Sequence, residues 1–108
     1  MSSTEELIDN LAVKVDGQDD KREITIFTLS TCMWCKKCKA WLNGRDVKYR
    51  YVDVDKIQPS QKAEIIEYLR NNYQNRISYP FMVCDKKDVV VGYDPSKYDE
   101  LLKQGGEA

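Results

Sequence analysis

The chain has 108 residues and a net charge of −1, with 42% hydrophobic and 32% charged residues. These values are typical of one globular domain and argue against disorder, and the balanced charge excludes charge-driven binding to nucleic acid or to a membrane. The sequence has no apolar run of transmembrane length and no signal-like stretch at its acidic N-terminus, so we expect a cytoplasmic protein. The absence of histidine excludes Cys/His zinc fingers and Cys–His proteases.

The N-terminal segment at residues 3–15 has the pattern of a short amphipathic helix. Ser3 and Glu6 have the spacing of a capping box, and apolar side chains follow on one helical face at Leu7, Ile8, Leu11 and Val15. Residues 16–22 are polar and indicate a loop. We therefore expect residues 1–22 to form a helical extension of a domain that spans residues 23–104.

The next segment predicts a strand, a helix and a second strand. Residues 23–29 are rich in strand-forming side chains, and the helical segment that follows ends near Gly44. Residues 47–54 alternate between apolar and polar side chains, as in a strand. Two strands joined by a helix form a parallel βαβ unit with a right-handed crossover.

The second half of the chain predicts a helix, a hairpin and a last helix. Pro59 favours the start of the first helix, and residues 81–84 and 89–91 are short apolar strands separated by a polar turn. Asp94 followed by Pro95 is typical of a helix start. The order of elements predicts an α/β protein in which a four-stranded mixed sheet is flanked by helices, with an extra helix at the N-terminus.

A Cys-Met-Trp-Cys motif at residues 32–35 lies where the first strand of the βαβ unit meets its helix. A helix N-terminus favours a thiolate at Cys32, and the lysines at positions 36, 37 and 39 add positive charge. Cys35 lies one turn further on, close enough to form a disulfide. Two inert buried cysteines are the alternative, but this context favours a thioredoxin fold and a thiol–disulfide oxidoreductase, with Cys32 as nucleophile and Cys35 as resolving thiol.

The sequence contains two further cysteines, Cys38 and Cys84. Cys38 extends the motif to Cys-x-x-Cys-x-x-Cys, a spacing found in iron–sulfur proteins. The alternative function is therefore a metal or iron–sulfur carrier that uses Cys32 and Cys35, with or without Cys38. Helical spacing, however, places Cys38 on the apolar face of its helix, which favours a buried core thiol. Cys84 lies in a short apolar strand and is expected to be a core residue as well. We therefore expect no metal site.

The motifs together resemble the glutaredoxin-like branch of the thioredoxin superfamily, and in part the redoxins that serve ribonucleotide reductase. The resemblance covers about residues 23–102. It rests on the cysteine motif, on the strand at residues 47–54 with its Asp-Val-Asp ending, on Ser-Tyr-Pro at residues 78–80 and on Val-Gly-Tyr-Asp-Pro at residues 91–95.

The resemblance implies a substrate-binding surface beside the dithiol. Pro80 matches the cis-proline position of the family, and Tyr79 precedes it, so the backbone there offers hydrogen bonds to a bound thiol or peptide. Gly92 and Asp94 match the segment that holds the terminal carboxylate or amine of glutathione. From its place between the two thiols, we also expect Trp34 to be exposed and to face a partner.

Three positions depart from the family pattern. Met33 replaces the proline after the first cysteine, Leu29 replaces a lysine of glutathione-using members, and Val91 replaces the first residue of a Gly-Gly pair. The last two changes weaken a glutathione site, so the electron donor stays open between glutathione, another thiol, and a flavoprotein or ferredoxin-linked reductase. We expect a monomer that acts on disulfide-containing proteins, receives electrons from a reductase or a low-molecular-weight thiol, and needs no cofactor beyond its redox-active disulfide.

Overall fold

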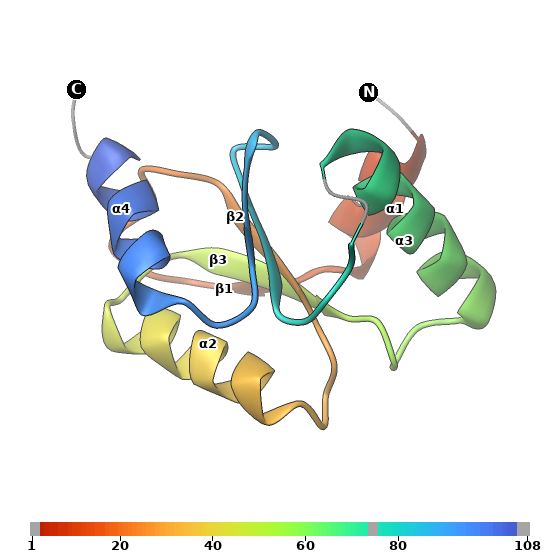
Figure 1. Ribbon diagram of the computed structural model, residues 1–108, viewed down its shortest axis with the longest axis horizontal. Coiled ribbons are helices and arrows are strands. Elements are labelled where there is room, and N and C mark those ends of the chain that lie inside the picture. Colours follow the sequence, from red (N-terminus) through yellow and green to blue (C-terminus); the bar gives the residue numbers. More distant parts are fainter. Residues whose placement is uncertain (1–2, 74–75, 106–108) are drawn as a thin grey trace.

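Helices and strands alternate along most of the chain in the computed structural model, which describes residues 3–73 and 76–105 (Figure 1). The predicted βαβ unit, hairpin and final helix are confirmed. Within the described ranges, no helix combines the length and the apolar character needed to cross a lipid bilayer. The elements are α1 (Ser3–Leu11), β1 (Val13–Val15), β2 (Ile24–Thr28), α2 (Met33–Gly44), β3 (Tyr49–Asp53), α3 (Pro59–Asn72), β4 (Phe81–Cys84), β5 (Asp88–Val91) and α4 (Pro95–Gly105).

The strands form one mixed sheet in the order β1-β3-β2-β4-β5. β2 and β3 are parallel, as expected for a βαβ unit, and every other neighbouring pair is antiparallel. Phe27 of β2 is in register with Val52 of β3 on one side and with Phe81 of β4 on the other. The α/β class and the thioredoxin fold are therefore confirmed, with five strands instead of the predicted four.

The fifth strand corrects the prediction for residues 13–15. The apolar spacing predicts a helix as far as Val15, but α1 ends at Leu11 and Val13–Val15 form β1. Val13 pairs with Tyr51 and Val15 with Tyr49, antiparallel to β3. The backbone of β3 offers partners that a sequence pattern does not show, and β-branched valines suit a strand.

Two apolar cores lie on the two faces of the sheet. In Figure 1, α2 and α4 cover one face, and α1 and α3 cover the other. Alternate side chains of a strand point to opposite faces, so Ile26 packs toward α2 and α4 while its neighbour Phe27 packs toward α1 and α3. This arrangement holds α2, which begins at the cysteine motif, against Ile24 and Ile26 of β2.

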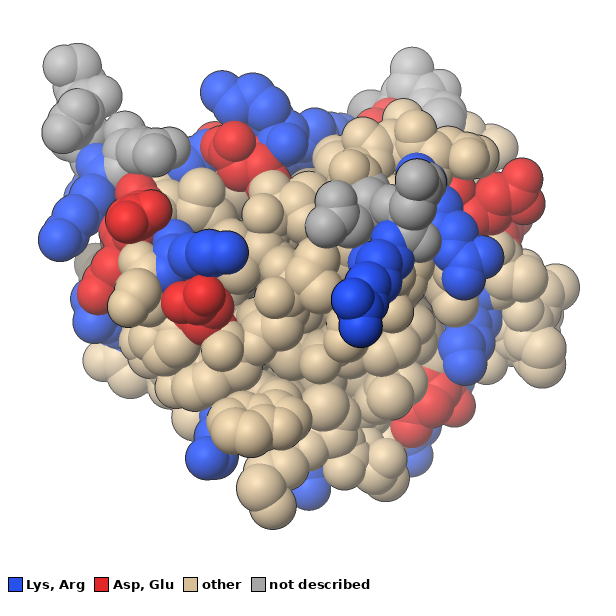
Figure 2. Space-filling model, in the orientation of Figure 1, with Lys and Arg blue, Asp and Glu red and all other residues tan. Residues whose placement is uncertain are grey.

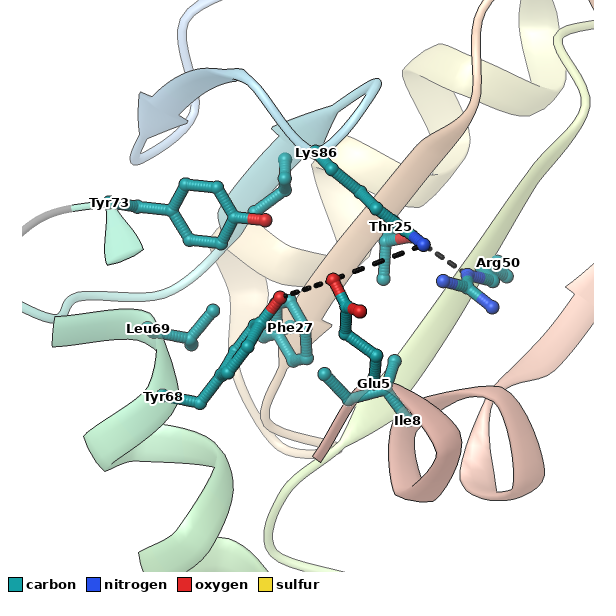
Figure 3. A pocket seen from close by; sticks show the side chains of 10 residues that line it. Glu5, Ile8, Thr25, Phe27, Arg50, Tyr68, Leu69, Tyr73 and Lys86 are labelled. Atoms are coloured by element: carbon teal, nitrogen blue, oxygen red, sulfur yellow. Dashed lines mark hydrogen bonds and ion pairs between the residues drawn. The ribbon is translucent and has the colours of Figure 1, made fainter. Parts of the chain in front are cut away.

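The N-terminal helix is joined to the rest of the protein by polar contacts around a small cavity (Figure 3). The Tyr68 hydroxyl of α3 donates a hydrogen bond to the Glu5 carboxylate over 2.8 Å, and the Lys86 ammonium lies 4.0 Å from the same carboxylate. Arg50 donates to Thr25 beside them. The cavity has a volume of about 20 Å³, which is room for about one water molecule, so it is no substrate site.

Arg22, in the loop before β2, is a buried ionic centre. Its guanidinium donates to Asp85 and to Asp88, each over 2.7 Å, and to the Leu101 carbonyl over 2.8 Å. The second oxygen of Asp85 accepts the backbone N–H of Glu23. One side chain that is 8% exposed therefore joins the start of β2, the β4–β5 turn and the end of α4.

Gly17 is a position where a side chain larger than that of glycine would collide with the backbone of a neighbouring segment. A Cβ atom at this position would lie 2.4 Å from the carbonyl carbon of Val47 and 2.5 Å from the nitrogen of Lys48. We expect Gly17→Ala to lower the free energy of unfolding by about 2–3 kcal/mol, because the backbone of the neighbouring segment must move. Chemical denaturation measures this change.

Gly44→Ala is the matched control. Gly44 is the last residue of α2, and a Cβ atom there meets nothing within 4 Å. Alanine is the better helix former, so this variant should be as stable as the wild type or slightly more stable. Equal losses of stability in the two variants would contradict the close approach at Gly17.

Candidate functional site

The cysteine motif lies at the N-terminus of α2, as predicted. Cys32 is the N-cap residue, with φ −82° and ψ 119°, and its Sγ accepts a hydrogen bond from the backbone N–H of Cys35 over 3.2 Å. Its carbonyl accepts the N–H of Lys36, which starts the helical hydrogen bonds. The sulfur of Cys32 therefore takes the place of the oxygen atom that usually caps a helix.

The loop between β2 and α2 is held by a hydrogen bond within the loop and by hydrogen bonds to the segment after β3. The Cys32 N–H donates to the Leu29 carbonyl over 3.1 Å. Ser30 donates to the Asp55 carboxylate from its backbone N–H, over 2.9 Å, and from its hydroxyl. These two hydrogen bonds hold the pKa of Asp55 below its usual range. The loop that carries Cys32 is thus tied to the segment after β3.

The two thiols of the motif differ in exposure. Cys32 is partly exposed, whereas Cys35 is 0% exposed. Burial, reinforced by contact with the Cys32 sulfur, raises the pKa of the Cys35 thiol to about 12. An external disulfide can reach the sulfur of Cys32 but not that of Cys35, so the geometry can support attack by Cys32 followed by an internal reaction of Cys35.

The three lysines of α2 do not act as one cluster. Lys36 and Lys37 are exposed, and the Lys37 ammonium lies 4.7 Å from the centre of the Trp34 ring. Lys39 instead forms an ion pair with Asp53 over 3.2 Å and lies over the Tyr51 ring. The prediction that Lys39 adds positive charge to the motif is wrong in this respect, because the helix turns its side chain toward β3.

Cys38 and Cys84 are both buried in the core beneath α2 and α4, as predicted. Burial raises the pKa of each thiol to about 11. Over residues 3–73 and 76–105, no group of three or more His, Cys, Asp and Glu side chains is placed to hold a metal ion. The donor set proposed for a metal or iron–sulfur carrier, with Cys38 as third ligand, therefore does not fit this arrangement.

We expect Cys38→Ala to leave disulfide reduction largely intact. The thiol is 0% exposed and packs as a small apolar side chain, so the main effect should be a cavity that costs about 1–2 kcal/mol of stability. A disulfide-reduction assay at a temperature where the variant is fully folded checks this. Loss of activity in the folded variant would show that Cys38 takes part in the chemistry.

A shallow hollow of about 280 Å³ lies beside the dithiol. Trp34, Ser78, Tyr79, Gly92 and Tyr93 line it, so the structure brings together three of the predicted binding residues. Trp34 is 55% exposed, as expected, and its ring stacks on that of Tyr93 with centroids 5.9 Å apart. In Figure 2 the surface over the start of α2, at the lower centre of the view, is mostly uncharged and is bordered by Lys and Arg side chains. The hollow therefore offers an aromatic wall next to an accessible sulfur.

The other two predicted binding residues, Pro80 and Asp94, do not line this hollow. The Tyr79–Pro80 peptide bond is cis, as the resemblance implies, and Pro80 is buried. The Gly92 N–H donates to the Pro80 carbonyl over 2.8 Å, which joins the two segments. Asp94 caps α4, because its carboxylate accepts the Lys97 N–H over 3.3 Å, and it is not among the residues that line the hollow.

Sequence reasoning missed Ser78 and Tyr93 as members of the site. Each is adjacent in the chain to a predicted binding residue, Tyr79 and Gly92 respectively, and each lies within a motif that carries the family resemblance. These positions were the available signals. The stacking of Tyr93 on Trp34 depends on the approach of α4 to α2, which local patterns do not reveal. Met33, 68% exposed next to Cys32, widens the apolar surface around the sulfur.

Comparisons with known proteins agree with this geometry. The family model of glutaredoxin matches residues 24–89. Glutaredoxin 1 of Rickettsia bellii is 32% identical over 76% of this chain and 79% of its own. A glutaredoxin from Methanosarcina mazei Go1 has a TM-score of 0.74 at 30% identity, covering 84% of this chain and 86% of its own. Methanosarcina acetivorans methanoredoxin has a TM-score of 0.75 at 30% identity, covering 83% and 94%. The chain therefore belongs to the glutaredoxin family of thiol oxidoreductases.

Proposed function

We propose that this protein reduces disulfides by dithiol exchange, with Cys32 as the attacking and Cys35 as the resolving residue. The observation that carries the proposal is the unequal pair of sulfurs at the start of α2. The accessible Cys32 sulfur accepts a hydrogen bond from the helix backbone, and Cys35 is buried directly beneath it. A backbone N–H that points at a sulfur favours its negatively charged form.

In the first step the Cys32 thiolate attacks one sulfur of the substrate disulfide. The new bond forms a mixed disulfide between Cys32 and the substrate while the substrate's own S–S bond breaks, and the departing sulfur leaves as a thiolate that takes a proton from water. Trp34, Tyr79 and Tyr93, which line the hollow, form the surface against which the substrate lies. No oxidant other than the substrate disulfide is needed.

In the second step the Cys35 thiol loses its proton and attacks the Cys32 sulfur. The Cys32–Cys35 disulfide forms, the mixed disulfide breaks, and the second substrate thiol is released. Contact with the Cys32 sulfur is one cause of the high pKa of Cys35, and a Cys32 sulfur held in a mixed disulfide carries no negative charge. The first step therefore removes part of what keeps Cys35 protonated.

The surroundings of Cys32 favour a protein substrate over glutathione. Met33 and Trp34, which follow Cys32 directly in the chain, are exposed apolar side chains of the kind that a docked polypeptide covers. Leu29, which replaces the lysine of glutathione-using members, packs against the core. We propose disulfide-containing proteins as substrates, a low-molecular-weight thiol or a reductase as electron donor, and the cytoplasm, where thiols stay reduced, as the site of action.

Peptide-level alkylation mapping of the anaerobically purified protein tests the proposal. In the reduced protein near neutral pH, Cys32 should be alkylated faster than Cys35, Cys38 and Cys84, because it is partly exposed and these three cysteines are buried. After oxidation, Cys32 and Cys35 should be recovered as one disulfide-linked peptide pair. Reduction of a model protein disulfide by the same preparation, with dithiothreitol as the donor, should then depend on this pair.

The same preparation tests the metal-carrier alternative. If Cys32, Cys35 and Cys38 resist alkylation until a chelator is added, and iron or zinc is found in stoichiometric amount, dithiol exchange is not the function. If Cys32 reacts freely and no metal is found, the carrier function is excluded for this preparation.

A further inference from the structure

Tyr98, in the first turns of α4, lies beneath the hollow without lining it. The side chain is 1% exposed, and its hydroxyl donates a hydrogen bond to the Gly92 carbonyl over 2.6 Å. Gly92 lines the hollow and has φ +90°, in the left-handed region that favours glycine. Tyr98 thus holds, from inside the protein, a residue that faces the substrate.

Gly92 is held from both sides of its backbone. Its N–H donates to the Pro80 carbonyl over 2.8 Å, and its carbonyl accepts the Tyr98 hydroxyl. The Pro80 bond holds the peptide unit before Gly92, whereas the Gly92 carbonyl belongs to the peptide unit after it, so the Pro80 bond does not by itself orient that carbonyl. That orientation depends on the Tyr98 hydroxyl.

The ring of Tyr98 also supports the aromatic wall of the hollow. It packs edge-on against Tyr93, with centroids 6.1 Å apart and an interplanar angle of 72°. Tyr93 in turn stacks on Trp34 at 5.9 Å and 28°. A continuous set of ring contacts therefore runs from the buried Tyr98 to the exposed indole beside Cys32.

The Tyr98 hydroxyl is suited to this task because it stays protonated. Burial raises the pKa of Tyr98 well above its usual range, so the O–H donates at any physiological pH.

We propose that Tyr98 is a positioning residue for substrate binding, which fixes the Gly92 carbonyl with its hydroxyl and the Tyr93–Trp34 pair with its ring. The inference rests on the proposed function, because it assigns the hollow to the substrate of the dithiol. In this role Tyr98 acts on the hollow and not on the sulfurs of Cys32 and Cys35, so it should affect substrate affinity and leave the chemistry of Cys32 unchanged.

Tyr98→Phe tests the hydroxyl, since it keeps the ring and removes one hydrogen bond. We expect KM for a protein disulfide to rise about five- to tenfold, the effect of losing one buried hydrogen bond, with kcat nearly unchanged. Alkylation of Cys32 by iodoacetamide should proceed at the wild-type rate, because that small reagent does not need the hollow. A fall in kcat without a rise in KM would overturn the proposal.

Tyr68→Phe is the matched control. Its hydroxyl also makes one hydrogen bond, of 2.8 Å to Glu5, but it lies on the other face of the sheet. This variant loses a bond of the same kind and should keep the wild-type KM. If Tyr68→Phe raises KM as much as Tyr98→Phe does, the effect is one of general stability and the positioning role is wrong.

An independent readout separates this inference from the proposed function. In a Trp41→Phe background, Trp34 is the remaining tryptophan, and its quenching by acrylamide reports its freedom. Tyr98→Leu, which removes the ring that packs on Tyr93, should increase that quenching, and Tyr68→Leu should not. If the wild type reduces no disulfide, the proposed function fails while the quenching result still tests Tyr98. Unchanged quenching together with an unchanged KM overturns the positioning role alone.

Discussion

Replacing Cys32 by serine is expected to lower the rate of disulfide reduction by at least about 1000-fold, because a hydroxyl is not ionised near neutral pH and cannot attack sulfur. The fold should be unaffected, since a serine oxygen at the N-cap accepts the Cys35 N–H as well as the sulfur does. The measurement is the rate at which a model protein disulfide is reduced with dithiothreitol as donor. Thermal unfolding of the variant at the wild-type temperature verifies that the site alone has changed.

Cys35→Ser separates the two steps of the reaction. Cys32 keeps its exposure in this variant, so the mixed disulfide with the substrate should form but should not be resolved. Mass spectrometry of the protein after incubation with a disulfide peptide should show a covalent adduct on Cys32. Cys38→Ala serves as the control, because the dithiol is intact and no adduct should accumulate.

Two results would contradict these roles. Full activity of Cys32→Ser would exclude Cys32 as the nucleophile, and equal rates for wild type and variant that do not exceed reduction by dithiothreitol alone would indicate a binding protein that has kept the fold. An adduct on Cys35 in place of Cys32 would reverse the assignment of nucleophile and resolving thiol, against the burial of Cys35.

Arg22→Met is expected to lower the free energy of unfolding by about 2–3 kcal/mol, or the Tm by about 10–20 °C. The guanidinium is nearly buried and makes three hydrogen bonds, and its removal leaves Asp85 and Asp88 side by side without their shared cation. Both carboxylates are partly exposed, at 41% and 33%, so water recovers some of the loss. Calorimetry measures the change.

Arg45→Met provides the comparison. Arg45 and Asp99 also form an ion pair with two hydrogen bonds, but the side chains are 48% and 34% exposed. A surface pair of this kind contributes at most about 1 kcal/mol. If the two variants lose the same stability, the buried position of Arg22 has no special importance.

The stability of the protein at acid pH should also depend on the ionic centre around Arg22. The backbone N–H of Glu23, and then Arg22, hold the pKa of Asp85 below its ordinary value of 3.8. A carboxyl group with a lowered pKa stabilises the fold above its unfolded-state pKa, and this contribution is lost as the pH falls below 3.8 toward the folded-state value. The stability of Arg22→Met should therefore decline less steeply than that of the wild type in this range.

The βαβ unit and its dithiol could be predicted because their signals are local. A strand-forming run, a motif with three-residue spacing and a glycine that ends a helix all lie within residues 23–44. The burial of Cys38 follows from helical periodicity in the same way. The exposure of Trp34 agrees with its place between the two thiols.

The parts that could not be predicted depend on residues far apart in the chain. Arg22 lies in a polar segment that indicates only a loop, and its partners Asp85 and Asp88 are more than sixty residues away. Val13–Val15 continue an apolar helical pattern, and only the neighbouring β3 makes them a strand. Tyr98 fits the buried face of a helix, and nothing local shows that its hydroxyl reaches Gly92.

The short strand β1 also affects how copies of this protein meet one another. Without it, the five-residue strand β3 would be an open sheet edge with unpaired N–H and C=O groups, the kind of surface on which chains associate strand to strand. β1 covers that edge with only three residues, one of them Lys14, and so leaves a short and charged border in its place. The N-terminal segment thus protects the redox domain against edge-to-edge aggregation, whatever else it contributes to stability.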